Sequence, residues 1–93
     1  MWEIYEHRRI GRRAPRLPAE ILMRYDRWKA VVRASGPTGL RWIKGFHDEA
    51  LSGNWRGHRS SRLGIQYRVI YRSFDREARV EVAAIVAHDY RRK

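Results

Sequence analysis

Cysteine is absent from this 93-residue chain, and long apolar runs are absent as well. Without cysteine the protein can have no disulfide bonds, no thiolate nucleophile and no thiolate zinc site. No apolar run approaches the length of a bilayer span, and the first residues lack the basic and apolar segments of a secretory signal. We therefore expect a soluble cytoplasmic protein with no membrane partner. Its length predicts a single domain over residues 1–93.

Acidic residues and lysines are also scarce. The chain has 21 Lys and Arg residues against 10 Asp and Glu, a net charge of +11, and its lysines are Lys29, Lys44 and Lys93. The other cations are arginines, whose planar guanidinium suits bidentate contacts with phosphate or carboxylate groups. This excess predicts a polyanionic partner, most simply nucleic acid. The basic residues are densest in 55–76, and a second excess lies in 1–36.

The first half of the chain has the pattern of a strand followed by helices. Residues 2–6 alternate weakly and predict a strand, and the basic stretch 11–16 is expected to form turns. Apolar residues then recur at helical spacing between Pro18 and Gly36. They are Ile21, Tyr25, Trp28 and Val32.

A second helix is expected from Thr38 to the turn at 52–54, so that the two helices form a hairpin. Its apolar face would carry Leu40, Ile43 and Leu51. His47 falls on the same face and is more simply explained as a core or interhelical residue than as a ligand.

After residue 54 the apolar period changes from that of a helix to that of a strand. The runs 58–63, 65–72 and 80–86 each alternate, and a polar turn at 74–77 separates the last two. These runs predict a three-stranded antiparallel meander. The expected fold is therefore α+β, in the order β-α-α-β-β-β, with the helical hairpin packed on one face of the sheet.

Strand alternation gathers several basic residues on one face. If Tyr67 and Tyr71 point at the helices, Arg68 and Arg72 point to the opposite face. The neighbouring strand can present a second set there, namely His58, Ser60 and Arg62. This predicts a basic surface that contains a histidine, in a register that a slip of one residue would undo.

Simpler explanations exist for some of these residues. A solvated strand face accounts for three of the arginines taken alone, Arg72, Arg76 and Arg79. Trp55 is a packing residue or a platform on which a base stacks. His58 lies on a different strand from His88 and Asp89, which is a weak pattern for a metal site, so we expect no metal and no other cofactor.

The last strand runs into His88-Asp89-Tyr90, three consecutive groups that can form hydrogen bonds or exchange protons. They cannot all point the same way in a strand. Either His88 and Tyr90 share a face, or the regular strand ends there. The pattern is more typical of a site at the end of a sheet than of a core strand.

Two segments of the chain resemble the RelE/ParE superfamily of toxins from bacterial type II toxin–antitoxin systems. One is the run from Leu51 to Gly64 followed by Tyr67-Arg68-Val69-Ile70-Tyr71, and the other is His88-Asp89-Tyr90. RelE-like and HigB-like members are small basic ribonucleases that cut messenger RNA, generally on the ribosome, and are silenced by an antitoxin. The resemblance implies a RelE-like fold, a metal-independent endoribonuclease activity, and as partners an acidic antitoxin, mRNA and ribosomal RNA.

The resemblance also implies roles for individual residues. Arg62 and Arg68 would stabilise the phosphate, and Tyr90 would position or stack on the cleaved nucleotide or assist proton transfer. The alternatives for the general acid and base are His58, His88 and Asp89. Contacts with the RNA backbone are expected from Arg56, Arg59 and Arg72.

The founding RelE branch relies on lysines in its active site, and none occurs between Arg56 and Arg72 here. A histidine-containing HigB-like or YoeB-like arrangement is therefore the closer analogy. Two other functions stay open. A ParE-like toxin would inhibit DNA gyrase without nuclease activity, and a generic basic domain would bind nucleic acid in a salt-sensitive way without turnover. Proton-transfer groups beside a basic cluster favour the nuclease, because a binding protein has no need of them.

Overall fold

The protein, described over residues 1–87 by a computed structural model, is built on a five-stranded sheet of order β1-β5-β4-β3-β2. The strands are β1 (Glu3–Glu6), β2 (Glu49–Ala50), β3 (Arg59–Arg62), β4 (Tyr67–Phe74) and β5 (Arg79–Ala87). The first strand runs parallel to β5, and the other neighbours are antiparallel. The α+β class, the N-terminal strand and the antiparallel meander are thus confirmed, and β2 is an additional short strand.

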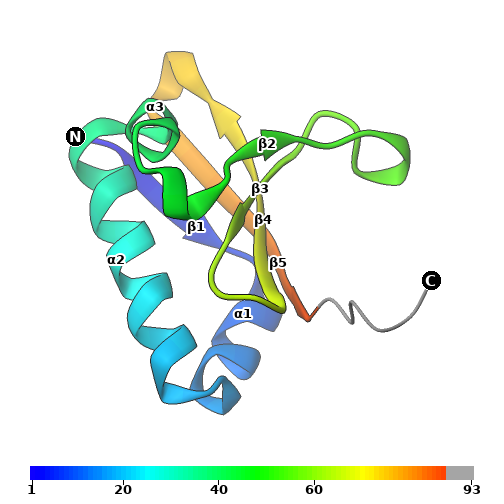
Figure 1. Ribbon diagram of the computed structural model, residues 1–93. Coiled ribbons are helices and arrows are strands. Elements are labelled where there is room, and N and C mark those ends of the chain that lie inside the picture. The colour runs from blue at the N-terminus through cyan, green and yellow to red at the C-terminus, as the bar shows by residue number, and fades with distance from the viewer. Residues whose placement is uncertain (88–93) are drawn as a thin grey trace.

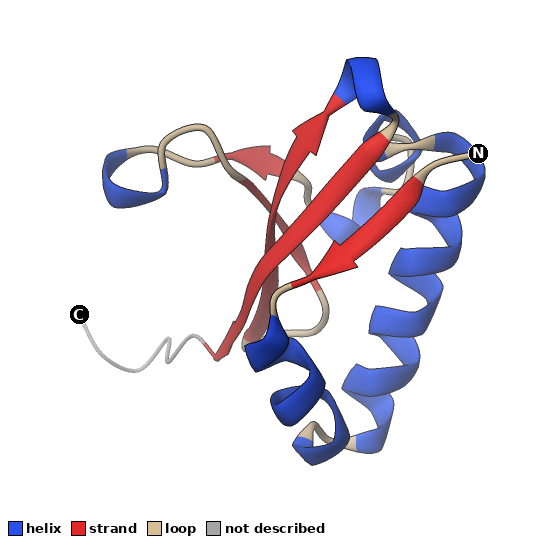
Figure 2. Ribbon diagram, turned by 180° about the vertical axis from the view of Figure 1, so that it is seen from behind, coloured by secondary structure: helices blue, strands red, loops and turns tan. Residues whose placement is uncertain are grey.

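The longest helix lies along one side of the sheet, and the segment between β2 and β3 projects on the other side (Figures 1 and 2). The helices are α1 (Arg8–Arg13), α2 (Ala19–Ser35) and α3 (Pro37–Arg41). Single 3₁₀ turns are η1 (Ala14–Arg16), η2 (Lys44–Phe46), η3 (Gly53–Trp55) and η4 (Asp75–Glu77). No helix in residues 1–87 is both long and apolar enough to cross a membrane.

The central helix forms as its apolar spacing predicts. Its buried stripe is Ile21, Tyr25, Trp28 and Val32. The Trp28 ring stacks on Tyr25 at 5.8 Å between centroids and meets the edge of Tyr71 from β4 at 5.3 Å. Gly36 ends the helix with a φ of 72°, and a Cβ there would lie 2.5 Å from the Trp2 ring. Only glycine satisfies both that backbone conformation and that contact.

The basic stretch 11–16, expected to form turns, is instead the end of α1 followed by η1. The helix is capped by His7, whose Nδ1 accepts a hydrogen bond from the backbone N–H of Arg9 at 3.1 Å. Ile10 is fully buried and anchors the helix to the core. One apolar anchor in a run of arginines gives too little periodicity for the sequence to reveal this helix.

The expected helix from Thr38 to residue 52 is wrong, because α3 ends at Arg41. Ile43 is already extended, and His47 adopts the left-handed conformation with a φ of 42°. The chain then turns inward, so that Phe46 and the side chain of Asp48 are buried. His47 is exposed and is not the core or interhelical residue that the helical pattern implied.

A buried carboxylate connects the layers of the fold. The Asp48 side chain has no exposed surface and accepts hydrogen bonds from Arg59 Nε at 2.7 Å, Ser61 Oγ at 2.7 Å and the Tyr71 hydroxyl at 2.5 Å. The Ser61 hydroxyl in turn accepts a hydrogen bond from Trp28 Nε1 at 2.9 Å. A single side chain thus links the approach to β2 with β3, β4 and α2.

Replacing Asp48 by alanine is expected to lower the free energy of unfolding by about 3 kcal/mol, because a buried charge pair loses one partner and three donors lose their acceptor. Urea denaturation monitored by tryptophan fluorescence measures this loss. The matched control is Glu20→Ala, which removes an exposed carboxylate paired only with Arg24 and is expected to cost less than about 1 kcal/mol. Equal losses in the two variants would contradict the role of Asp48.

Stability is also expected to depend on alkaline pH through Tyr71. Burial raises the pKa of its hydroxyl, and the hydrogen bond to Asp48 raises that pKa further. A group whose pKa is raised by folding stabilises the protein fully below the unfolded value, about 10 for tyrosine, and this contribution is lost as the pH rises through the folded value. Above pH 10 or so the free energy of unfolding should therefore fall more steeply in the wild type than in Tyr71→Phe.

Tyr25 contributes to the same pH dependence, because burial and a hydrogen bond to Glu6 raise the pKa of its hydroxyl as well. The comparison therefore needs a variant that also lacks this hydroxyl. Denaturant titrations between neutral pH and about pH 11 should give the shallowest slope in the double variant Tyr25→Phe/Tyr71→Phe. Identical slopes in all the proteins would refute the assignment.

Candidate functional site

The face of the sheet away from α2 carries a pair of arginines from two neighbouring strands. Arg62 of β3 and Arg68 of β4 are directly opposite each other in the antiparallel register, so both side chains start from the same face. Ile70, two residues further along β4, is buried but stands outside the main hydrophobic core, as expected for this second face. The residues on either side of Ile70 in β4, Val69 and Tyr71, point to the opposite face and belong to that core.

Arg68 is held by two side chains. Its Nη1 donates to Ser60 Oγ at 2.8 Å and to Glu49 Oε2 at 3.0 Å. Ser60 is buried, whereas the Glu49 side chain is 56% exposed. These contacts fix the guanidinium on the open face of the sheet and leave it accessible from the side of Glu49.

Glu49 is a site residue that the sequence reasoning missed. The expected helix placed it away from the arginines, whereas β2 pairs it with Ser60 of β3. The available signal was Asp48-Glu49, two adjacent carboxylates ahead of the most basic segment of the chain. In an extended segment such neighbours point to opposite sides, so one can enter the interior while the other faces Arg68.

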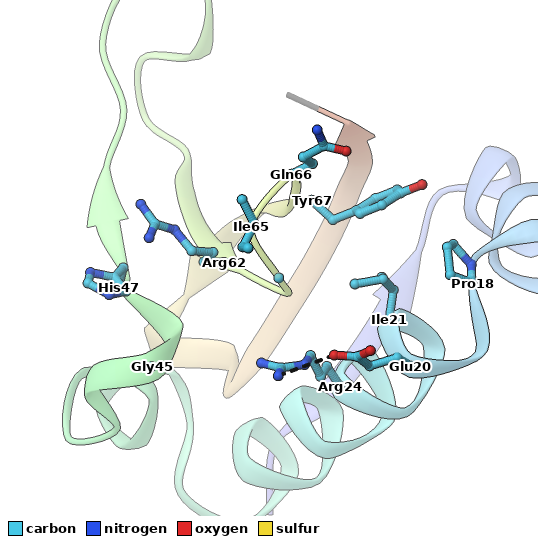
Figure 3. A pocket seen from close by; sticks show the side chains of 11 residues that line it. Pro18, Glu20, Ile21, Arg24, Gly45, His47, Arg62, Ile65, Gln66 and Tyr67 are labelled. Atoms are coloured by element: carbon cyan, nitrogen blue, oxygen red, sulfur yellow. Dashed lines mark ion pairs between the residues drawn. The ribbon is translucent and has the colours of Figure 1, made fainter. Parts of the chain in front are cut away.

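Arg62 borders an open hollow of about 820 Å³ at the end of the sheet. Figure 3 shows its guanidinium turned toward His47, across the hollow from Ile21 of α2. Its Nε is buried and has no hydrogen-bond partner within residues 1–87. Compared with Arg68, Arg62 therefore has an unused donor.

His58 lies just before β3, at the base of the segment that projects from the sheet. The backbone N–H of His58 donates to the carbonyl of Trp55 at 2.9 Å, and the Trp55 ring meets the imidazole edge-on at 5.1 Å between centroids. Its Nδ1 is buried without a hydrogen-bond partner in the described part of the chain. Arg56 is exposed in the same segment. Trp55 thus packs on His58 and is 36% exposed.

Arg59 lies with the buried network and not on the arginine face. It is opposite Tyr71 in the register, and its Nε is bonded to Asp48. Burial lowers the pKa of Arg59, but the hydrogen bond and the attraction to Asp48 together hold it above its ordinary value. Arg59, predicted to contact the RNA backbone, is thus bonded to Asp48 through its Nε while its side chain stays 25% exposed.

The remaining arginines of the meander lie further along the sheet. Arg72 is exposed on β4 and stacks over the Phe74 ring at 5.0 Å, and Arg79 lies over the same ring at 4.5 Å. Arg79 also pairs with Glu81 at 3.3 Å. Arg76 is exposed in η4, between β4 and β5. Arg72 therefore shares the face of Arg68, but it contacts Phe74 at the other end of the strand.

His88, Asp89 and Tyr90 lie outside the described residues, and their expected roles stay predictions. The described chain ends at Ala87, which pairs with Tyr67 of β4, the residue before Arg68. Within residues 1–87, no three His, Asp or Glu side chains are placed to share a metal ion. The expectation of a site without a metal also stays a prediction.

No protein-family model and no curated protein matches the sequence. Solved structures match along nearly the whole chain. A chain of the archaeal RelE–RelB complex from Pyrococcus horikoshii has a TM-score of 0.76 at 18% identity, with 96% of this chain and 97% of that chain covered. A chain of the YoeB–YefM complex from Staphylococcus aureus has a TM-score of 0.72 at 14% identity, with coverages of 96% and 99%.

A third structure, the YoeB/ParE toxin from Agrobacterium tumefaciens, has a TM-score of 0.69 at 18% identity, with 94% of this chain and 99% of that chain covered. These likenesses extend over at least 94% of this chain and at least 97% of each similar chain. The protein therefore has a RelE-like fold, which it shares with these three solved chains.

Proposed function

We propose that this protein is the toxin of a type II toxin–antitoxin pair and that it cleaves messenger RNA as a metal-independent endoribonuclease. The observation that carries the proposal is the pair of arginines, Arg62 and Arg68, opposite each other on the open face of a RelE-like sheet. Two guanidiniums so placed can bind one phosphate from two sides.

The reaction fits what this face offers. In the proposed cleavage the 2′-oxygen of a ribose attacks the adjacent phosphorus, and the 5′-oxygen of the next nucleotide leaves. The charge that builds on the phosphate oxygens needs fixed cations, which Arg62 and Arg68 supply. Because Ser60 and Glu49 already orient Arg68, little rearrangement is needed for it to act.

The proton transfers need a base for the 2′-hydroxyl and an acid for the leaving oxygen. Among the described residues, Glu49 is hydrogen-bonded to Arg68, and His58 lies just before β3, the strand of Arg62. His88 and Asp89 remain alternatives, and Tyr90 is proposed to position the cleaved nucleotide. Arg56 and Arg72 are proposed to contact the RNA backbone on either side.

An acidic antitoxin is the proposed protein partner. Similar chains were solved in the RelE–RelB and YoeB–YefM complexes, and a net charge of +11 on this chain favours an acidic binding protein. We further propose that cleavage occurs on the ribosome in the cytoplasm, where ribosomal RNA would supply additional phosphates.

Replacing Arg68 by alanine is expected to lower the rate of RNA cleavage by about 100-fold, because a fixed cation at the reacting phosphate is lost. Cleavage of a messenger RNA by the purified protein in the presence of purified ribosomes measures the rate, and growth arrest on expression should be relieved. The control is Arg76→Ala, which removes an exposed arginine in η4 and should leave the rate unchanged. Equal rates in Arg68→Ala and the wild type, with both proteins folded, would rule out this site.

The second candidate function is inhibition of DNA gyrase, because one of the similar structures is a YoeB/ParE toxin. Primer extension on cellular messages after expression separates the two functions. The nuclease predicts new 5′ ends within translated regions. Their absence, together with cleaved or relaxed plasmid DNA, would favour the gyrase inhibitor instead.

A further inference from the structure

Four arginines form a cluster on one side of the first helical segment. Arg9, Arg12, Arg13 and Arg16 follow one another at intervals of three, one and three residues, which brings them to one helical face. All four are exposed and line a hollow of about 350 Å³. We call this group the α1 arginine cluster. The hollow is completed by Leu17, which is buried, and by Tyr67 of β4.

In the described part of the chain, no carboxylate forms an ion pair with this cluster. Within residues 1–87, the ion pairs involve arginines and lysines elsewhere, and the only side-chain contact within this group is from Arg9 to the ring of His7. Like charges three and four residues apart destabilise a helix by a few tenths of a kcal/mol per pair. The fold thus maintains a repulsion that a bound anion would relieve.

The chemistry of the hollow favours phosphates over a protein surface. Exposed guanidiniums can each bind a phosphate through two N–H groups. A protein interface depends on apolar anchors at its centre, and the large apolar side chains that this molecule exposes lie elsewhere. Three of them are Met23, Trp42 and Ile65.

Tyr67 connects the cluster with the arginine pair. Its side chain lines both the α1 hollow and the hollow bordered by Arg62, and it directly precedes Arg68 in β4. In Figure 3 the Tyr67 ring points away from Arg62. Because Tyr67 lines both hollows, a polyanion bound at Arg62 can pass Tyr67 and reach the α1 arginine cluster.

We propose that the α1 arginine cluster binds backbone phosphates of the RNA strand that is cleaved at Arg62 and Arg68, at nucleotides flanking the cut. This inference rests on the proposed function. It assigns the basic excess of the first third of the chain to the substrate strand, and Tyr67 to the path between the two sites.

The test compares a short and a long RNA, of about four and about fifteen nucleotides, which bracket the site sizes of single-strand binders. A 2′-O-methyl backbone removes the attacking hydroxyl, so that binding is measured by fluorescence anisotropy without cleavage. In the double variant Arg12→Gln/Arg13→Gln, the affinity for the long RNA should fall several-fold. The slope of log affinity against log salt should become shallower by about 1.4, at about 0.7 per lost contact. Binding and cleavage of the short RNA should not change.

The matched control is Arg41→Gln/Arg76→Gln, which removes the same charge from exposed positions outside the hollow. It should bind both RNAs nearly as the wild type does. An equal loss in the two double variants, or an equal loss for short and long RNA, would show a general charge effect and overturn the proposal.

Two further outcomes are decisive. If the cluster variant binds long RNA normally but loses its antitoxin, the cluster is a protein interface and the proposal is wrong. If the wild type cleaves neither RNA, alone or with purified ribosomes, the proposed function fails, and this inference fails with it. Cleavage of the short RNA tests the proposed function alone. Normal cleavage of that RNA by the cluster variant therefore distinguishes a failure of this inference from a failure of the proposed function.

Discussion

The buried carboxylate of Asp48 is the interaction on which the described structure depends. It joins Arg59, Ser61 and Tyr71, and through Ser61 it reaches Trp28 in the centre of α2. The next residue, Glu49, leaves this network and contacts Arg68 on the opposite side of the sheet. One dipeptide therefore connects the core to the arginine face, and the position of Arg68 depends on a carboxylate that it does not touch.

Much of the fold follows from periodicity. The α2 stripe and the alternating runs of β3, β4 and β5 are long enough to specify element type and register, and the arginine pair follows from that register. The expected second helix failed because Leu40, Ile43 and Leu51 happen to fit helical spacing. What decides the structure there is the burial of Asp48, a tertiary effect with no period in the sequence. The burial of Asp48 also explains why Arg59 bonds to this carboxylate and why Glu49 reaches Arg68.

The arginine face also shows why composition alone could not define the site. Of the arginines in the basic second half, Arg59 serves the interior, Arg72 stacks on Phe74, and Arg62 and Arg68 form the pair. The same residue type thus has three different surroundings within one sheet. Alternation along a strand distinguishes its two faces, but only the partners across the sheet show which arginine is engaged and which has an unused donor.

The contact between Glu49 and Arg68 has a consequence for selectivity. Arg68 is paired with an internal anion before any ligand arrives, so binding there is an exchange of one anion for another. The net gain is the difference between the incoming group and the displaced carboxylate. A small monovalent anion gains little by such an exchange, whereas a phosphate that also reaches the guanidinium of Arg62 gains a second contact. The ion pair between Glu49 and Arg68 therefore favours ligands that engage Arg62 and Arg68 at once over ligands that engage Arg68 alone.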